Sequence, residues 1–174
     1  MRLNFQYPDD IVRSCTKYLL SIPEITSVVG EFPGGAPFVF EEAIGVPMEG
    51  ASVNFPGNPV TALVVQSGGS WATPAPQTTE LFPKITIEIW ADPPRDAKRQ
   101  VTRPRDARIA ADYLFQVVDR YMNFTSSDVV MMNEQPVWKS YRLGNITYLP
   151  RVNSDDYLIL GTVSYGLQTA MFFS

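Results

Sequence analysis

The side chains that could do chemistry in this chain of 174 residues are nearly all carboxylates, because the sequence contains no histidine and a single cysteine, Cys15. Histidine is the usual general base near neutral pH, the commonest metal ligand and the partner in Ser–His and Cys–His nucleophiles. Its absence excludes those forms of catalysis and leaves carboxylates alone as metal ligands. Cys15 falls at an apolar position of a predicted helix, where we expect a buried and inert thiol.

Six of the acidic residues form three adjacent pairs: Asp9/Asp10, Glu41/Glu42 and Asp155/Asp156. Neighbouring residues point to opposite faces of a strand and diverge by about 100° on a helix, so such a pair rarely forms one site. The first pair stands at the start of a predicted helix, where acids compensate the helix dipole. The last pair precedes a predicted strand and is typical of a turn. The middle pair has no assigned role.

Phosphate-binding patterns are missing from the sequence as well. The glycine pairs Gly34-Gly35 and Gly68-Gly69 lack the lysine and the following helix that a P-loop requires, and no G-x-G-x-x-G pattern occurs. With neither a histidine-activated nucleophile nor a spaced set of acids, we expect no catalytic, metal or cofactor site. We therefore expect that the protein is not an enzyme.

A basic cluster holds six of the fourteen positive charges within fourteen positions: Arg95, Lys98, Arg99, Arg103, Arg105 and Arg108. Three interpretations are open: a solvated loop with local partners, a surface that docks on an acidic patch of a neighbouring subunit, and a phosphate contact with nucleic acid. The net charge of −4 provides no general attraction to nucleic acid. The segment also lacks the interleaved aromatic residues on which bases stack.

Two tryptophans are further candidates for an interface. Trp71 lies in a long segment without regular pattern, and an isolated tryptophan in a mobile loop is costly to leave in water. Trp90 ends a predicted strand close to the basic cluster, and it could equally lie under a helix. We expect a subunit or partner interface to include Trp71, Trp90 and the basic residues Arg95, Lys98, Arg99, Arg103 and Arg105.

The composition agrees with a protein that is buried against partners. Charged residues make up 18% of the chain, against roughly 25% in an average soluble domain. Interface cores are depleted in charge and enriched in aromatic residues. The sequence has no signal peptide and no run of about 20 apolar residues, so we expect synthesis in the cytoplasm, without export and without a membrane span.

The chain is predicted to be organised around the strand Ile85–Ala91, in which three isoleucines alternate with polar residues and define one apolar face. The helix Pro104–Met122 follows, with apolar residues three and four positions apart. Such a stripe is wide enough to cover the isoleucine face. We therefore expect this helix to pack back on this strand.

Before the isoleucine strand, the sequence predicts an extended arm over Met1–Tyr7, a helix over Pro8–Ile22 ended by Pro23, and extended pieces at Phe38–Phe40 and Ala51–Asn54. These are followed by a central strand buried on both faces over Val60–Gln66 and a long hairpin arm over Ser67–Pro83. After the second helix come a connection with a short buried strand or turn over Phe124–Gln135, strands over Val137–Leu143 and Ile146–Val152 with a turn at Gly144-Asn145, and the longest strand over Tyr157–Thr169. This order predicts one α+β domain over residues 1–174. It has a mixed, largely antiparallel sheet, two helices packed on one face and a long loop or hairpin arm.

This layout resembles the tail terminator proteins of long-tailed (siphovirus-type) bacteriophages, the lambda-type tail terminator and neck family. The similarity rests on a leading amphipathic helix and on the strands Thr61–Gln66 and Lys84–Ala91 joined by a long arm. It continues with the helix Arg105–Met122 after a basic, proline-rich link, and with a closing pair of strands that ends in Leu158–Tyr165. The similarity is one of order and texture over most of the chain. The region Glu31–Pro59, rich in glycine and proline, matches the family least.

The resemblance implies a virion protein of the tail or neck, made in the host cytoplasm. Its subunits would form a homohexameric ring that caps the finished tail tube, stops tube polymerisation and presents a surface to the head–tail connector. The implied partners are other copies of the chain, the tail tube protein and the connector, with genomic DNA passing through the lumen without specific binding. No membrane partner, cofactor or catalytic residue is implied, and sheet edges and loop arms would join the subunits.

Three other functions remain as alternatives. A head–tail adaptor or tail completion protein of the neck would have the same size and composition. A nuclease or hydrolase with a carboxylate-bound metal is disfavoured by the missing histidine and by the lack of spaced acids within one strand–helix unit. A monomeric binding module is the third.

Overall fold

The computed structural model describes residues 8–31, 34–41, 59–68, 72–74, 78–81, 83–98, 100–133, 135–150 and 159–172. The helices in these ranges are α1 (Pro8–Leu20), α2 (Pro23–Thr26) and α4 (Pro104–Met122). The strands are β1 (Val39–Glu41), β2 (Val60–Ser67), β3 (Ala72–Pro74), β4 (Thr78–Leu81), β5 (Lys84–Asp92), β6 (Phe124–Met132), β7 (Gln135–Arg142), β8 (Thr147–Pro150) and β9 (Ile159–Phe172). The predicted α+β class is confirmed.

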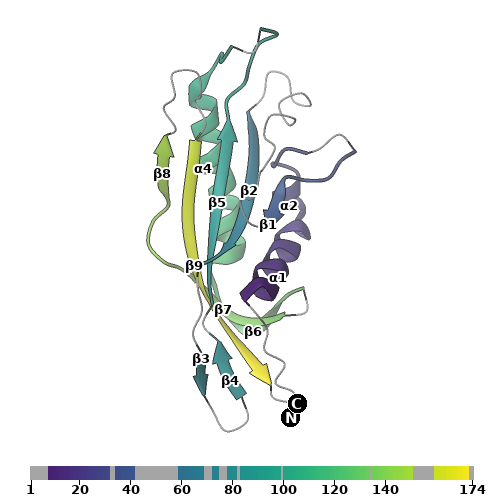
Figure 1. Cartoon of the computed structure of the whole chain (residues 1–174), viewed down its shortest axis with the longest axis vertical. Coiled ribbons are helices and arrows are strands. Elements are labelled where there is room, and N and C mark those ends of the chain that lie inside the picture. Colours follow the sequence, from purple (N-terminus) through teal and green to yellow (C-terminus); the bar gives the residue numbers. More distant parts are fainter. Residues whose placement is uncertain are drawn as a thin grey trace.

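The nine strands form one sheet that is organised along β9 (Figure 1). One edge of β9 pairs first with β5 and then, near its end, with β4. The other edge pairs with β8 and then with β7. The sheet continues from β5 to β2 and β1, and every pairing is antiparallel except that of β1 with β2. The long last strand that the sequence predicts is therefore the element that joins both halves of the sheet.

The core lies between the sheet and its helices. Ile85, Ile87 and Ile89 are buried, and the residues between them are partly exposed, so the predicted alternation of β5 is confirmed. Buried residues of α1 and α4 join these isoleucines in one hydrophobic cluster. Both helices therefore cover the same face of the sheet, as the sequence predicts. The bounds predicted for the second helix, Pro104–Met122, are those observed for α4.

The strand β2 is buried on both faces from Val60 to Val65, as predicted for a central strand. On the face away from the helices, Val60 and Ala62 form a small cluster with Phe38, packed by Phe40 and Trp90. Trp90 pairs in register with Ala62 and alternates with the buried residues of β5. It therefore does not lie under a helix, because its side chain points to the opposite face of the sheet.

The predicted hairpin arm is present as β3 and β4, which pair with each other antiparallel. β4 also pairs with the last residues of β9, from Thr169 to Phe172. This pairing lies beyond the part of β9 that pairs with β5, so the arm extends the sheet past the body covered by the helices (Figure 1). The segment between β2 and β5, which shows no regular pattern in the sequence, is therefore paired with the end of β9, about 90 residues later in the chain.

Two of the predicted boundaries are wrong. The first helix ends at Leu20 instead of Ile22, and Pro23 begins α2 because proline suits the first position of a helix. The connection after α4 is a strand of nine residues, β6, that pairs with β7. The chain turns between them at Asn133, whose φ of 57° is tolerated by asparagine better than by most residues.

The strand β7 lacks the regular alternation of buried and exposed residues that an undistorted strand has. Val137 and Ser140 are both buried although they lie three residues apart. The register with β9 shifts between Val137 and Lys139, and such a shift changes the face to which the following residues point. The buried hydroxyl of Ser140 donates a hydrogen bond to the carbonyl oxygen of Met122, at the end of α4.

The predicted turn at Gly144-Asn145 does not close a hairpin. β7 and β8 both pair antiparallel with β9 along the same edge, so they run in the same direction one after the other. Gly144 has a φ of 81° at the bend between them. The extended pieces predicted at Met1–Tyr7 and Ala51–Asn54 lie outside the described residues, as does the acidic pair Asp155/Asp156.

Candidate interaction surfaces

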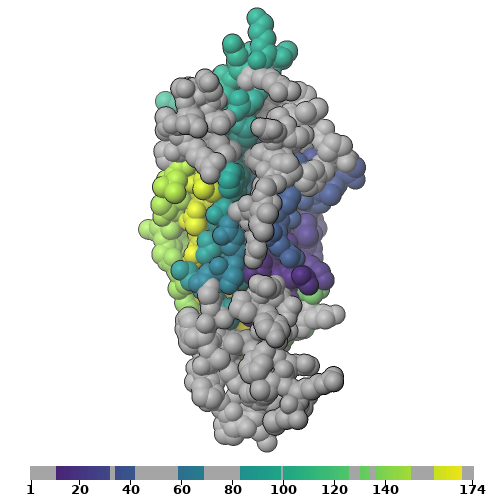
Figure 2. All heavy atoms as spheres, in the orientation of Figure 1, coloured from purple at the N-terminus to yellow at the C-terminus, as the bar shows by residue number. Residues whose placement is uncertain are grey.

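The basic segment, residues 95–108, begins as a compact loop closed by its own backbone. Arg95 forms a bridge with Val101, and the amide of Asp96 donates to the carbonyl of Gln100 over 2.9 Å. The Asp96 carboxylate accepts hydrogen bonds from the amides of Lys98 and Gln100, at 2.8 and 2.9 Å. The loop therefore presents Lys98 at a structured tip, and it stands out at one end of the molecule (Figure 2).

Three arginines of the basic segment have acidic neighbours. Arg95 lies 3.1 Å from Asp92, Arg103 lies 3.2 Å from Asp106, and Arg108 lies 3.3 Å from Asp112. Local partners therefore account for half of the six cations in this segment.

The other three cations of the segment are Lys98, Arg99 and Arg105. Lys98 and Arg105 are exposed, and neither forms an ion pair with any residue that the structure describes. Arg99 lies outside the described residues. The segment thus contains three arginines with local ion pairs and two exposed cations that another molecule can reach. Its predicted role in an interface stays a prediction.

The two predicted tryptophans are not brought together. Trp71 lies outside the described residues. The indole nitrogen of Trp90 donates to a carboxylate oxygen of Glu88 over 3.0 Å, and its ring packs in the small cluster on the open face of the sheet. Its partly buried ring leaves some surface for a partner.

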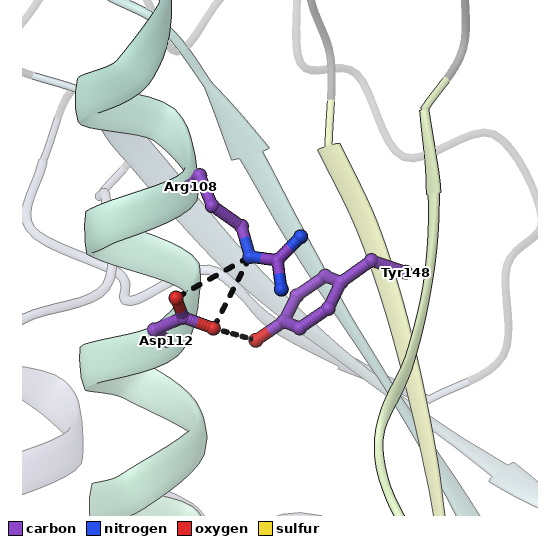
Figure 3. Close-up of polar contacts among 3 residues, drawn as sticks. All are labelled: Arg108, Asp112 and Tyr148. Atoms are coloured by element: carbon purple, nitrogen blue, oxygen red, sulfur yellow. Dashed lines mark hydrogen bonds and ion pairs between the residues drawn. The ribbon is translucent and has the colours of Figure 1, made fainter.

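A cluster that sequence reasoning missed joins α4 to β8 (Figure 3). The hydroxyl of Tyr148 donates to Asp112 over 2.5 Å, and the Arg108 side chain donates to both oxygens of the same carboxylate at 3.3 Å. The Arg108 guanidinium also lies 3.6 Å from the centre of the Tyr148 ring, a cation–π contact. Burial and the hydrogen bond with Asp112 raise the pKa of Tyr148 well above its usual range.

A second cluster of the same kind joins α4 to β7 and β9. The hydroxyl of Tyr165 donates to Asp119 over 2.9 Å, and Arg142 donates to the other oxygen of that carboxylate over 2.9 Å. Arg142 also lies 5.5 Å from the centre of the Phe115 ring. Burial first, and then the hydrogen bond with Asp119, raises the pKa of Tyr165. Both carboxylates are thus committed to holding α4 against the sheet.

The remaining reactive group is Cys15, which is buried as predicted. Its thiol lies 3.9 Å from the sulfur of Met122, and burial raises its pKa to about 12. Within the described residues, no three or more His, Cys, Asp or Glu side chains gather where they could hold a metal ion. In the same residues, no helix has the length and apolarity needed to cross a membrane.

The outer face of α4 carries a second feature that the sequence reasoning missed. Ile109 is 66% exposed and Tyr113 is 55% exposed, one helical turn apart. They lie opposite Ala107, Ala111 and Leu114, which are buried in the core. The amphipathic pattern predicts the buried stripe, but it does not predict an apolar pair on the far side of the helix.

The fold itself has a counterpart among solved structures. No model of a known protein family matches this sequence, and no curated protein matches it. The chain is similar to a chain in the structure described as "Virion of native gene transfer agent (GTA) particle", with a TM-score of 0.53 and 9% sequence identity. The similarity covers 92% of this chain and 94% of that chain. The two therefore share a fold from end to end, at an identity too low to show more than the fold.

Proposed function

We propose that this protein is a structural component of a virion, and that it acts as a tail terminator. In this role its copies form a ring that caps the tail tube, stops tube polymerisation and presents the joining surface to the head connector. The observation that carries the proposal is the end-to-end similarity, over more than nine tenths of both chains, to a chain of a virion particle. The order of elements, which resembles the tail terminator family, supports the finer assignment.

The distribution of features along the molecule supports assembly. The β3–β4 arm projects at one end, and the loop of the basic segment stands at the other (Figure 1). Among the described residues, β8 pairs with β9 alone, so its other edge has no partner strand there. Exposed edges pair readily with other chains. Different surfaces at different places on one subunit suit head-to-tail contacts, which close into rings when the rotation permits.

The proposed partners are other copies of this chain in a hexamer, the tail tube protein and the head–tail connector. We assign the protein no catalytic role, because the carboxylates of Asp112 and Asp119 are engaged by tyrosine and arginine donors and the Cys15 thiol is buried. Genomic DNA would pass through the lumen without specific binding, since a net acidic subunit repels the DNA backbone. The proposed location is the virion tail or neck, after synthesis in the host cytoplasm.

The test is to purify the protein, measure its mass by sedimentation velocity, image it by negative-stain electron microscopy and add polymerising tail tube protein. A tail terminator gives rings alone or on the tube, and tubes stop at a defined length. A protein that binds the head connector but leaves tube length unchanged is a head–tail adaptor instead. A strictly monomeric species that binds neither component at high concentration contradicts the proposal.

A further inference from the structure

The β3–β4 arm continues the strands of the helix-covered body. β4 and β5 lie end to end along one edge of β9 in the same register, because Leu81 is opposite Thr169 and Lys84 is opposite Gly166. In the same way, β3 pairs with β4 and β2 pairs with β5. The arm is therefore connected to the body through three neighbouring strand pathways, which are β2–β3, β4–β5 and β9.

Pro83 stands between β4 and β5, opposite Leu167 of β9 in the same register. The amide of Leu167 donates a hydrogen bond to the carbonyl oxygen of Pro83 over 2.9 Å. In an antiparallel ladder the two residues of such a pair exchange two hydrogen bonds, but proline has no N–H to supply the second. The ladder between β9 and β4–β5 is therefore weaker at this pair. We call the pair Pro83 and Leu167 the joint.

The pathway β2–β3 is irregular at the same level. The amide of Gly68 donates to the carbonyl oxygen of Lys84 over 2.6 Å, which ends the ladder of the body on this side. The ladder of the arm begins where Ala72 pairs with Leu81. Four positions separate Gly68 from Ala72, whereas three separate Leu81 from Lys84. One extra residue on one side of an antiparallel pair is the count of a β-bulge, which disrupts the ladder locally.

The third pathway, β9, is a continuous strand from Ile159 to Phe172. It is fixed to the body as far as Thr169, which is buried and whose hydroxyl donates to the carbonyl oxygen of Pro136 over 2.6 Å. Leu167 is buried in the main hydrophobic cluster. Beyond Thr169 the strand continues into the arm, where it pairs with β4. Two of the three pathways are thus weakened next to a point where the third is firmly held.

We propose that the β3–β4 arm is a hinged element, which turns as a unit relative to the helix-covered body about the joint. Hinges consist of a few residues at the ends of elements, and Pro83 is such a residue between β4 and β5. The arm can then change its direction while the core of the subunit stays as it is. This inference concerns a single subunit, and it does not depend on the proposed ring.

A fixed bend is the competing interpretation, because bulges and prolines also shape sheets that do not move. A sheet keeps a fixed angle when other elements pack across it. In the body, α1 and α4 share one hydrophobic cluster with β2, β5 and β9. These helices do not extend over the arm (Figure 1). The observations therefore favour a hinge.

The test is to measure distances within the full chain by double electron–electron resonance between two nitroxide labels. The arm pair carries Thr73→Cys in β3 and Gln116→Cys on the exposed side of α4, and the reference pair carries Lys17→Cys on α1 and Gln116→Cys. Excess unlabelled protein limits the signal to distances within one chain, and the buried Cys15 stays unlabelled. The distance distribution of the arm pair should be about twofold wider than that of the reference pair, because a hinge displaces the whole element beyond it.

Two proline variants locate the joint. Pro83→Val supplies the missing N–H together with a β-branched side chain that suits a strand, so it should narrow the distribution of the arm pair toward that of the reference pair. Pro74→Val is the matched control, because it makes the same change within β3, on the arm side of the joint. It should leave the distribution as wide as in the wild type.

The outcomes separate this inference from the proposed function. If the arm pair of the wild type is as narrow as the reference pair, the bend is fixed and the inference is overturned, whether or not Pro83→Val folds. If the two valine variants narrow the distribution equally, Pro83 is not the hinge and the inference is also overturned. Rings and tube length decide the proposed function independently. A hinged arm on a protein that forms no ring supports this inference alone, and a ring of subunits with fixed arms supports the proposed function alone.

Discussion

Asp112 and Asp119 lie seven residues apart on α4, and each accepts a hydrogen bond from a tyrosine hydroxyl of the sheet. The spacing of two turns places both carboxylates on the same flank of the helix. Tyr148 of β8 reaches the first and Tyr165 of β9 reaches the second. These two hydrogen bonds fix the rotation of α4 about its axis more closely than apolar packing alone. They therefore also fix the direction in which Ile109 and Tyr113 point away from the core.

The first prediction concerns the tie between Tyr165 and Asp119. Replacing Tyr165 by Phe removes the hydroxyl without leaving a large cavity, and among the described residues it leaves the Asp119 carboxylate with Arg142 as its hydrogen-bond donor. The free energy of unfolding should fall by about 1.5–3 kcal/mol, the range for hydrogen bonds to charged groups. Urea denaturation measures this loss. Tyr113→Phe, at an exposed position, is the control and should leave stability unchanged.

The second prediction is a loss of stability at alkaline pH. The pKa values of Tyr148 and Tyr165 are raised in the folded protein, whereas tyrosine in the unfolded chain titrates near 10. The folded state therefore holds these protons more tightly, so the stabilisation is fully present below about pH 10 and is lost as pH rises above it. Thermal melting between pH 8 and pH 11 should reveal the decline, and Tyr165→Phe should make it shallower. An equal slope in both proteins contradicts the assignment.

The third prediction concerns the glycine beneath Tyr148. A Cβ atom at Gly161 would lie 2.8 Å from the Tyr148 ring and 3.0 Å from the side chain of Ile146. Because Arg108 lies 3.6 Å from the centre of that ring and Asp112 holds its hydroxyl, the ring cannot move away freely. Gly161→Ala should lower the free energy of unfolding by about 1–3 kcal/mol, the usual effect of overpacking. The same substitution should cost less when Tyr148 is already Ala, and equal costs in a double-mutant cycle would show that the ring is not the obstacle.

The fourth prediction uses Cys15 as a reporter of opening. The thiolate is the reactive form, and burial raises the pKa of Cys15 to about 12, so the native thiol should not react with an aromatic disulfide reagent at pH 8. Labelling should require unfolding, and its rate should rise with urea. Rapid labelling of the fully native protein would contradict the buried position of this side chain.

Local patterns in the sequence predict the parts of this fold that depend on periodicity. The alternating isoleucines of β5 and the apolar stripe of α4 predict the strand, the helix and the faces they bury. The uniformly apolar β2 predicts a strand buried on both sides. These features are predictable because each is set by the spacing of apolar residues within a single element.

The features that escaped prediction depend on residues far apart in the chain. The register shift in β7 is defined only against β9, and the sequence predicts the hairpin arm but not the pairing of β4 with the end of β9. The tyrosine partners of Asp112 and Asp119 lie 36 and 46 residues later along the chain. No single-segment pattern contains such information. The sequence predicts the basic segment as a cluster of charge. Which of its arginines form ion pairs depends on the positions of Asp92, Asp106 and Asp112.

The last prediction tests the arm in assembly. Its strands β3 and β4 are attached to the body through β4 and the last four residues of β9, beyond the pairing of β9 with β5. Replacing residues 72–81 by a short Gly–Ser linker should therefore leave the helix-covered part of the sheet folded, with a similar far-UV circular dichroism spectrum and melting temperature. If the arm reaches a neighbouring subunit or the tube, the shortened protein should remain monomeric and should fail to stop tube growth. A linker variant that forms rings and caps tubes as the wild type does would remove the arm from the proposed assembly, and a variant that unfolds would show that the arm stabilises its own subunit.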